Sequence, residues 1–380
     1  MKSKSTASRS WNAIPIGALL WIAFVRCFSQ DLPARTLAIG SPAPDFRLTG
    51  IDGRTLGLKD FSTSKILVLI FTANHCPTAQ AYEERIMRLT EDYRTKGVTV
   101  ACISSNNPEA LRLDEMGYTD LGDSMEDMKI RAKDMGFRFV YLYDGDEQAA
   151  AKAYGPVSTP HVFIFDQKRL LRYAGRVDDS EKIEKVTVSD TRNALDALLA
   201  GKPVSVETTK TFGCSIKWAY KKTSAQESLK RWAQEPVILE TMDTDGIRKL
   251  LTNPSDKLLL LNVWATWCGP CQTEFPELVT INRMYRNREF EMVTLSADTP
   301  DKKENVLAFL RKNEASARNR IFSLDDKYKL IEAVDPKWQG GLPYTLLIKP
   351  GGEILYRTMG AIDPLEVKKA IVGYLGRYFK

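Results

Sequence analysis

Histidine and cysteine are scarce in this sequence of 380 residues. There are two histidines and six cysteines, and only one pair, Cys268 and Cys271, has the spacing C-x-x-C. A structural zinc site takes four ligands of these types, and the second pair that would complete such a site is missing. The cysteine pair therefore indicates redox chemistry rather than metal binding.

Charge of one sign is not in large excess either. The formal net charge is +6, but four basic residues and no acidic residue occur before residue 30. The rest of the chain carries 50 basic and 48 acidic residues, a balance that does not call for nucleic acid or a charged membrane surface as a partner. Hydrophobic residues make up 43% and charged residues 27%, as in ordinary globular proteins, and the length suffices for two domains.

The first 29 residues differ from the rest of the chain. Three basic residues occur among the first nine, and an uncharged, largely apolar segment follows over Ala13–Val25. That segment is too short for a comfortable membrane span and is typical of a signal peptide. We expect residues 1–29 to be a signal peptide cleaved before Gln30, and the protein to be periplasmic or secreted, where disulfides persist. The alternative is an uncleaved N-terminal membrane anchor.

The C-x-x-C pair lies between an apolar run of strand length, residues 257–263, and an amphipathic stretch, residues 272–281. We therefore expect a buried strand that delivers both cysteines to the start of a helix. The first helical turn has unpaired N–H groups and a partial positive charge, which favour a thiolate. Cys268 is the predicted low-pKa nucleophile, and Cys271, three residues later on the same helix face, is its predicted disulfide partner.

The motif W-A-T-W-C-G-P-C at residues 264–271 resembles the thioredoxin superfamily. It is most similar to the exported thioredoxin-like reductases that serve cytochrome c maturation, the TlpA/ResA type, and the resemblance covers residues 235–380. The resemblance implies that Trp267 contacts substrates. Asn262 stands six positions before the first cysteine, where thioredoxin has a buried aspartate, so the usual proton acceptor is absent from that position.

An earlier part of the chain repeats this pattern with one cysteine missing. A strand over residues 65–71 precedes Cys76, and an amphipathic helix is predicted over Tyr82–Tyr93. When the two copies are aligned, Cys76 falls on the first cysteine of the C-x-x-C pair and Ala79 falls on the second. The first copy has therefore kept the nucleophile position and lost its partner.

A proline enters a strand at the same place in both copies, Pro160 in the first and Pro343 in the second. A proline there cannot donate to a sheet ladder, and we expect both to be the cis prolines of thioredoxin-like folds. The backbone before such a proline can pair with an extended substrate strand beside the nucleophile. Both prolines are therefore candidate substrate-binding residues.

The first copy resembles the alkyl hydroperoxide reductase/thiol-specific antioxidant (AhpC/TSA) redoxins. It looks most like a peroxiredoxin-like family marked by N-H-C-P and G-C-S-I-K-W, found here at residues 74–77 and 213–218. The match covers residues 36–220. True peroxiredoxins have a threonine three positions before the cysteine, and this chain has Ala73 there.

Three further residues have open roles. Protonated His75 would favour the Cys76 thiolate, or it is a surface histidine without such a role. Cys102 lies in the middle of an apolar strand and is expected to be a buried, inert thiol. Cys214 is the candidate resolving thiol for Cys76, or it is a packing residue beside Trp218.

The predicted fold is α/β, with two tandem thioredoxin-like domains, each a central mixed sheet flanked by helices. The predicted domains are a redoxin domain over residues 36–200, a linker with the G-C-S-I-K-W motif over 201–234, and a thioredoxin domain over 235–380. The predicted function is extracytoplasmic thiol–disulfide exchange, with Cys268 attacking and Cys271 resolving a mixed disulfide. The expected partners are protein thiols and disulfides and an upstream electron donor, without cofactor, metal or nucleic acid.

Two alternatives stay open. One is a thiol peroxidase that acts through Cys76 and is reduced by the C-x-x-C domain. The other is a non-catalytic scaffold whose thioredoxin folds only hold extended peptides.

Overall fold

The computed structural model describes Met1 and residues 35–378. The predicted signal peptide, residues 1–29, lies outside the described residues apart from Met1. In this described part, no helix combines the length and the apolar character needed to cross a membrane.

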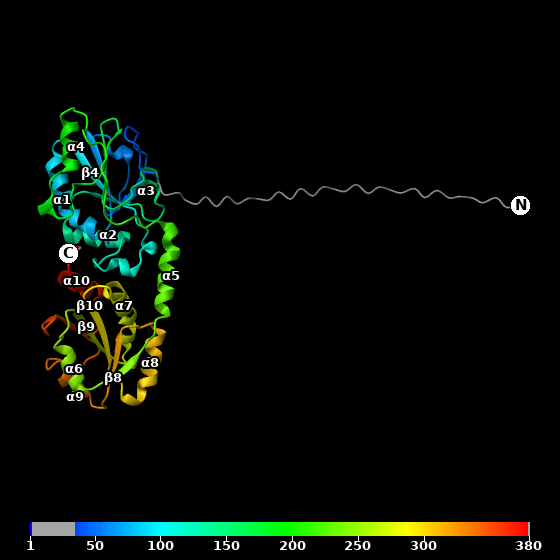
Figure 1. Ribbon diagram of the computed structural model, residues 1–380, viewed down its shortest axis with the longest axis vertical. Coiled ribbons are helices and arrows are strands. Elements are labelled where there is room, and N and C mark those ends of the chain that lie inside the picture. The colour runs from blue at the N-terminus through cyan, green and yellow to red at the C-terminus, as the bar shows by residue number, and fades with distance from the viewer. Residues whose placement is uncertain (2–34, 379–380) are drawn as a thin grey trace. The chain divides into compact units, whose positions relative to one another are not determined.

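The first sheet has seven strands in the order β2-β1-β5-β4-β3-β6-β7. Figure 1 labels β4 among these strands. Its central strand β3 pairs in parallel with β4 and antiparallel with β6, so the sheet is mixed. The strands are β1 Arg47–Gly50, β2 Thr55–Gly57, β3 Ile66–Thr72, β4 Val98–Ser104, β5 Val140–Tyr143, β6 His161–Phe165 and β7 Leu171–Gly175.

Helices cover both faces of this sheet because every residue of β3 is buried and alternate side chains point to opposite faces. Val68 packs in a core with α1 and α4, whereas Leu69 packs in a second core with α3. The helices of this part of the chain are α1 Pro77–Arg94, α2 Met125–Met135, α3 Ala149–Tyr154 and α4 Asp190–Leu199, and α5 Lys222–Ala233 follows them.

The second sheet has six strands in the order β13-β12-β9-β10-β11-β8. Strand β9 pairs in parallel with β10 and antiparallel with β12. The predicted α/β fold with two mixed sheets is confirmed. The strands are β8 Leu239–Met242, β9 Leu258–Trp264, β10 Phe290–Ser296, β11 Arg318–Phe322, β12 Tyr344–Ile348 and β13 Ile354–Met359.

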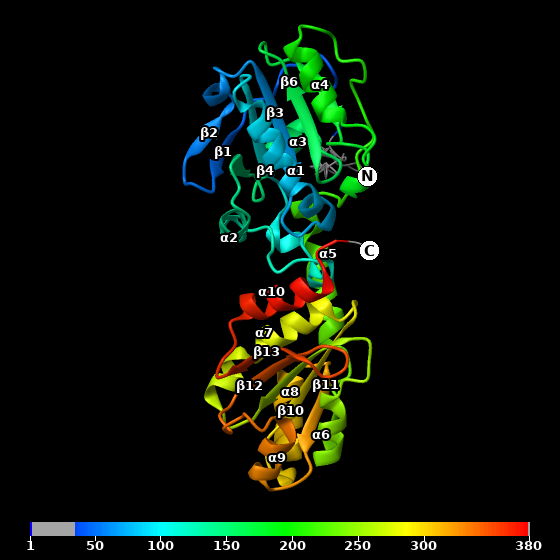
Figure 2. The same cartoon turned by 90° about the vertical axis from the view of Figure 1, so that its left-hand side faces the viewer.

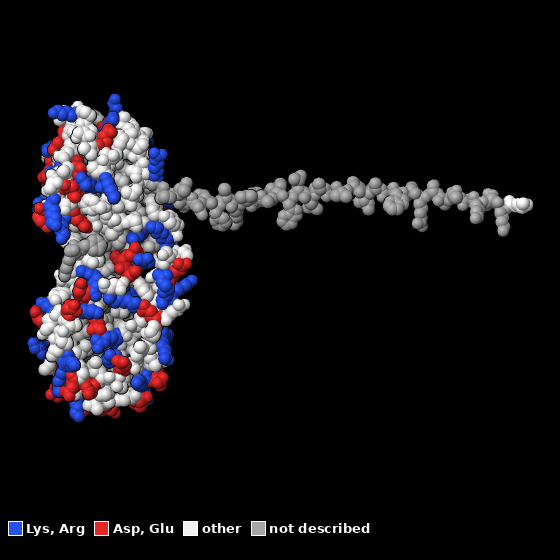
Figure 3. Space-filling view, viewed as in Figure 1, with Lys and Arg blue, Asp and Glu red and all other residues white. Residues whose placement is uncertain are grey.

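The second sheet is also covered on both faces (Figure 2). Leu260 of β9 packs with α7, α8 and α10, and Leu261 packs with α6 and α9 on the opposite face. The helices are α6 Thr244–Leu251, α7 Gly269–Tyr285, α8 Lys303–Lys312, α9 Lys327–Val334 and α10 Pro364–Leu375. On the molecular face seen in Figure 3, basic and acidic side chains are interspersed, in keeping with their similar numbers.

Helix α1 starts earlier than the sequence predicts. It begins at Pro77, whereas the amphipathic pattern gave a start at Tyr82. Cys76 is the N-cap residue, and its Sγ accepts a hydrogen bond from the amide of Ala79 at 3.4 Å. Proline fits the first helical position because no N–H is needed there, so residues 77–81 are already helical.

Candidate functional site

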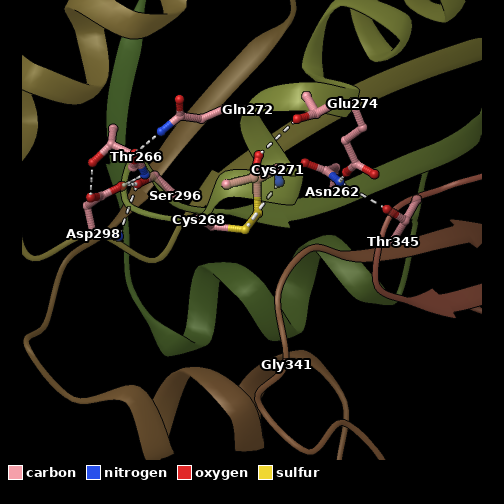
Figure 4. Close-up of a disulfide and its surroundings, with 12 residues drawn as sticks. Asn262, Thr266, Cys268, Cys271, Gln272, Glu274, Ser296, Asp298, Gly341 and Thr345 are labelled. Carbon is pink, nitrogen blue, oxygen red and sulfur yellow. Dashed lines mark hydrogen bonds between the residues drawn. A yellow bond between two sulfur atoms is a disulfide. The ribbon is translucent and has the colours of Figure 1, made fainter.

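Strand β9 and helix α7 place the C-x-x-C pair as predicted. Cys268 is the N-cap residue of α7, and its Sγ accepts a hydrogen bond from the amide of Cys271 at 3.2 Å. The two cysteines form a disulfide, with their Cα atoms 5.3 Å apart (Figure 4). The Cys271 amide, in the first helical turn, thus faces the sulfur of Cys268, where it can stabilise a thiolate after reduction.

The two cysteines differ in exposure. Cys268 is 6% exposed, whereas Cys271 is fully buried beneath it. The neighbouring Trp267 is 70% exposed, and it offers a flat apolar surface at the rim of the disulfide. A substrate disulfide can therefore approach Cys268 from the Trp267 side, and Cys271 is shielded from solvent.

The loop before the disulfide is held by Asp298. The Oδ2 atom of Asp298 accepts hydrogen bonds from the amide of Thr266 at 2.9 Å and from Ser296 Oγ at 2.7 Å. Its Oδ1 atom accepts a third bond from Thr266 Oγ1 at 2.5 Å, and Gln272 Nε2 donates to the carbonyl of Thr266 (Figure 4). These bonds tie the loop to the end of β10 and to the first turns of α7.

Strand β9 carries an amide, Asn262, where thioredoxin has an aspartate, but the carboxyl group of Glu274 from α7 lies beside it. Asn262 Nδ2 donates to Glu274 Oε1 at 3.0 Å and to Thr345 Oγ1 at 2.9 Å (Figure 4). Glu274 Oε2 accepts the amide of Ile362 at 2.8 Å. Burial raises the pKa of Glu274, and these two hydrogen bonds oppose that rise. Glu274 was not predicted from the sequence as a site residue. The one feature that could have indicated it is an acidic residue three positions after Cys271, in a helix with an apolar face.

Both prolines singled out in the sequence follow cis peptide bonds, Thr159–Pro160 and Leu342–Pro343, as predicted. In the second domain, the main chain of Leu342 makes no hydrogen bond within residues 35–378. Its N–H and C=O groups are therefore available to pair with an added strand.

The site of the first domain is built around Cys76, which is fully buried. Its Sγ accepts hydrogen bonds from the amides of Ala79 and Cys214, each at 3.4 Å, and lies 3.3 Å from the carbonyl oxygen of Thr159. Burial alone raises the pKa of Cys76, but the hydrogen bond from the Cys214 thiol and the charge of His75 outweigh it. The net effect lowers the pKa of Cys76 to about 6.

His75 is not a surface residue, so that alternative was wrong. It is 1% exposed, and its Nδ1 lies 2.5 Å from Oδ2 of the buried Asp123. Burial lowers the pKa of His75, but the charge of Asp123 raises it further, and the net direction is upward. Asp123 also accepts from the amides of Asn74 and His75 and from Asn106 Nδ2. The raised pKa of His75 favours its charged form, which in turn lowers the pKa of Cys76.

The structure brings Cys214 to Cys76, although neither is in a disulfide. Cys214 is partly exposed and packs against Cys76. The contact with Cys76 raises the pKa of Cys214, because the Cys214 thiol donates its proton toward the Cys76 sulfur. Cys102 is fully buried, and burial raises its pKa well above the ordinary value, as expected of an inert thiol.

No group of three or more histidine, cysteine, aspartate and glutamate side chains that could hold a metal ion occurs in residues 35–378. Most polar groups near the two cysteine sites are hydrogen-bonded to one another or to the main chain. Within residues 35–378, His75 Nε2 and Asn262 Oδ1 are buried without a hydrogen-bond partner. The chemistry that these sites support directly is that of their sulfur atoms.

Known families match both parts of the chain. Residues 39–174 match the model of the AhpC/TSA family, and residues 223–371 match the model of the Redoxin family. The chain belongs to the thioredoxin-like superfamily. It thus combines an AhpC/TSA domain with a redoxin domain.

Curated relatives include thiol-disulfide oxidoreductases called ResA. The chain is 28% identical over 140 residues to that of Bacillus subtilis (strain 168), which covers 37% of this chain and 73% of the relative. It is 30% identical over 134 residues to that of Oceanobacillus iheyensis, which covers 34% of this chain and 63% of the relative. The chain is therefore a distant homologue of thiol–disulfide oxidoreductases of the ResA kind.

Similar solved structures include proteins from Sinorhizobium meliloti 1021 and Geobacillus kaustophilus. A hypothetical protein from Sinorhizobium meliloti 1021 is 34% identical, with a TM-score of 0.44, and the match covers 49% of this chain and 97% of that one. A conserved protein from Geobacillus kaustophilus is 38% identical, with a TM-score of 0.43, and the match covers 48% of this chain and 94% of that one.

Proposed function

We propose that the chain is an extracytoplasmic thiol–disulfide oxidoreductase that works through Cys268 and Cys271. The observation that carries the proposal is the Cys268–Cys271 disulfide at the N-terminus of α7, with Cys268 the more exposed of the two. The main chain of Leu342, which has no hydrogen bond within the described residues, supports it. The names of the ResA relatives support the same chemistry. The periplasmic or secreted location rests on the signal-peptide pattern of residues 1–29.

The reaction follows from the difference in exposure. In the reduced protein, the Cys268 thiolate attacks one sulfur of a substrate disulfide, and the other substrate sulfur leaves as a thiolate. The Cys271 thiol then loses its proton and attacks the sulfur of Cys268, and the second substrate sulfur leaves. The products are two substrate thiols and the Cys268–Cys271 disulfide. An upstream electron donor must return two electrons before the next cycle.

Glu274 is suited to hold the proton that Cys271 releases. It lies one helical turn after Cys271, it is 5% exposed, and burial raises its pKa, which favours uptake of a proton by its carboxylate. Asn262 and the amide of Ile362 fix both carboxyl oxygens. The buried carboxyl thus comes from the helix in this chain, whereas thioredoxin has it on the strand.

Insulin reduction tests the proposal. With a small dithiol as electron donor, the full chain should precipitate insulin, and Cys268→Ser should abolish this activity because the attacking sulfur is gone. Cys102→Ser is the matched control, since that thiol is fully buried in β4 and takes no part in the reaction. Insulin reduction by the Cys268→Ser variant would refute the assignment and favour a scaffold that only binds peptides.

A second candidate function, a thiol peroxidase, is favoured by the thiol pair Cys76 and Cys214. The pKa of Cys76 is lowered to about 6, and the Cys214 amide and thiol both contact its sulfur. A hydroperoxide would oxidise the Cys76 thiolate to a sulfenic acid and leave as an alcohol. The Cys214 thiol would then form the disulfide and release water, and the reduced Cys268–Cys271 pair would reopen it.

Peptide mapping under non-reducing conditions tests this second function. Mild hydrogen peroxide should yield a cross-linked peptide that contains Cys76 and Cys214, and Cys76→Ser should stop peroxide consumption while Cys102→Ser should not. Unchanged peroxide consumption in the Cys76→Ser variant would remove this function and leave the dithiol function of the second domain intact.

A further inference from the structure

Residues 213–217, here called the strap, lie along the main chain that precedes Pro160. The amide of Thr159 donates to the carbonyl of Cys214 at 2.9 Å, and Thr159 Oγ1 donates to the same oxygen at 3.4 Å. Thr159 and Cys214 form an isolated antiparallel bridge. The strap therefore joins the first domain as one short added strand.

The start of the strap requires glycine. Gly213 has a φ of +130°, a conformation that side chains rarely adopt, and a Cβ atom there would lie 2.0 Å from the carbonyl oxygen of Thr159. The same Cβ would lie 2.9 Å from the carbonyl carbon of Thr159. Both neighbours are main-chain atoms, so they cannot turn aside, and only glycine permits the strap to approach this closely.

The far end of the strap is held by buried polar side chains. The amide of Lys217 donates to Asn106 Oδ1 at 2.8 Å, and its carbonyl accepts from Gln148 Nε2 at 2.9 Å and from the amide of Asn107 at 2.8 Å. The residue before it, Ile216, is 1% exposed. The strap is thus fixed at both ends, and Cys214 lies between these anchors, over the sulfur of Cys76.

In the second domain, no segment among the described residues pairs with the main chain before the cis proline. Leu342 stands before Pro343 as Thr159 stands before Pro160, but its main chain has no partner in the described residues. One copy of the repeat is therefore open to a strand from another polypeptide. In the other copy, a segment of the same chain already occupies the equivalent position.

We propose that the strap is a built-in substrate strand. The position beside Cys76 along the main chain of Thr159, here called the groove, takes an extended segment in which glycine precedes cysteine. Residues 213–217 of this chain are its occupant. The occupant closes the first domain to external polypeptides and keeps Cys76 fully buried. This proposal goes beyond the dithiol chemistry of the second domain and does not depend on it.

Amide hydrogen exchange of the unaltered full chain is the first test. The Thr159 amide should exchange at least about tenfold more slowly than the Leu342 amide, after correction for intrinsic rates, because only Thr159 is bonded to a docked strand. Equal protection of the two amides overturns the proposal. No variant is needed, so failure to fold cannot confuse the result.

Alkylation of Cys76 is the second test, with sites and rates determined by mass spectrometry. Gly213→Ala should raise the rate of alkylation by iodoacetamide about tenfold, because the strap can no longer seat against Thr159. Ser215→Ala is the matched control, since Ser215 lies in the same segment, is exposed and has no side-chain hydrogen bond in residues 35–378. Equal rates in the two variants overturn the proposal.

A synthetic peptide with the sequence of residues 210–219 tests the specificity of the groove. Added to the Gly213→Ala protein, it should restore slow alkylation of Cys76, whereas the same peptide carrying Gly213→Ala should not. If the two peptides act alike, the groove does not select glycine before cysteine and the proposal fails.

Discussion

Replacing Cys214 by alanine tests how the first domain stabilises a buried thiolate. Burial opposes the charge on Cys76, and the largest opposing contribution is the hydrogen bond from the Cys214 thiol, followed by the charge of His75. Cys214→Ala removes that hydrogen bond and leaves the Cys214 amide, His75 and the Ala79 amide in place. Cys214→Ser is the matched control because a hydroxyl group can still donate to the Cys76 sulfur.

The expected size of the effect follows from the charge of the acceptor. A hydrogen bond to a charged group contributes about 1.5–3 kcal/mol, and one pKa unit corresponds to about 1.4 kcal/mol. Cys214→Ala should therefore raise the pKa of Cys76 from about 6 to between about 7 and 8. At neutral pH the thiolate fraction would fall from about nine-tenths to about half or less.

The ultraviolet absorbance of the thiolate, followed as a function of pH, measures this shift. The Cys268–Cys271 disulfide does not titrate, and burial moves the titration of Cys102 to high pH, so the first transition belongs to Cys76. The serine variant should titrate close to the unaltered protein. If the alanine variant titrates at the same pH as the unaltered protein, the Cys214 thiol does not stabilise the thiolate and the explanation is wrong.

The same shift predicts how stability depends on pH. The pKa of Cys76 falls from 9.0 for an ordinary thiol to about 6 in the folded chain, so the unfolded chain binds more protons between these values. The free energy of unfolding should therefore increase as the pH rises from about 6 to about 9. This contribution to stability is present in full above about pH 9 and is lost as the pH falls through about 6. Urea unfolding at a series of pH values measures this free energy. It should increase over a narrower pH range in Cys214→Ala, because the pKa of Cys76 in that variant lies closer to the value in the unfolded chain.

Three further results are expected. Glu274→Gln should lower insulin reduction at neutral pH and flatten its pH profile, because an amide cannot take up the proton of Cys271; an unchanged profile would exclude this role. Arg131→Met should lower the free energy of unfolding by about 3 kcal/mol in urea, since it leaves the carboxylate of Glu83 buried without its partner; a loss well under 1 kcal/mol would show that water reaches that carboxylate. The exported protein should start near Gln30 in N-terminal sequencing, and an intact N-terminus would refute cleavage.

Local patterns in the sequence were sufficient to predict the second site. An apolar run, two cysteines and an amphipathic stretch follow one another within residues 257–281, so strand β9, the N-cap cysteine and helix α7 are all encoded by neighbours. The alignment of the two copies then located Cys76 and the two cis prolines, because each has a counterpart at the same place in the repeat.

Contacts between residues far apart in the chain could not be predicted in this way. Asp123 follows His75 by 48 residues, in a segment without a counterpart in the second copy, and nothing local marks it as a partner. The pairing of Cys214 with Thr159 spans 55 residues. Glu274 is a different case. Its burial depends on whether α10 and the loop before it cover this face of α7, and that loop supplies the Ile362 amide that donates to Glu274.

Because the strap belongs to the same chain, it has an advantage over any free polypeptide that competes for the groove of the first domain. About a dozen residues connect the end of α4 to Gly213, so the strap is never far from its site. A short flexible tether holds a segment at an effective concentration in the range of about 1 mM, and here hydrogen bonds between Ala174 and residues 207–209 hold the tether itself against β7. A free polypeptide at about 1 μM would need roughly a thousandfold higher affinity to compete equally. The first domain can therefore prefer its own chain through proximity, in addition to the hydrogen bonds that hold Cys214 and Lys217.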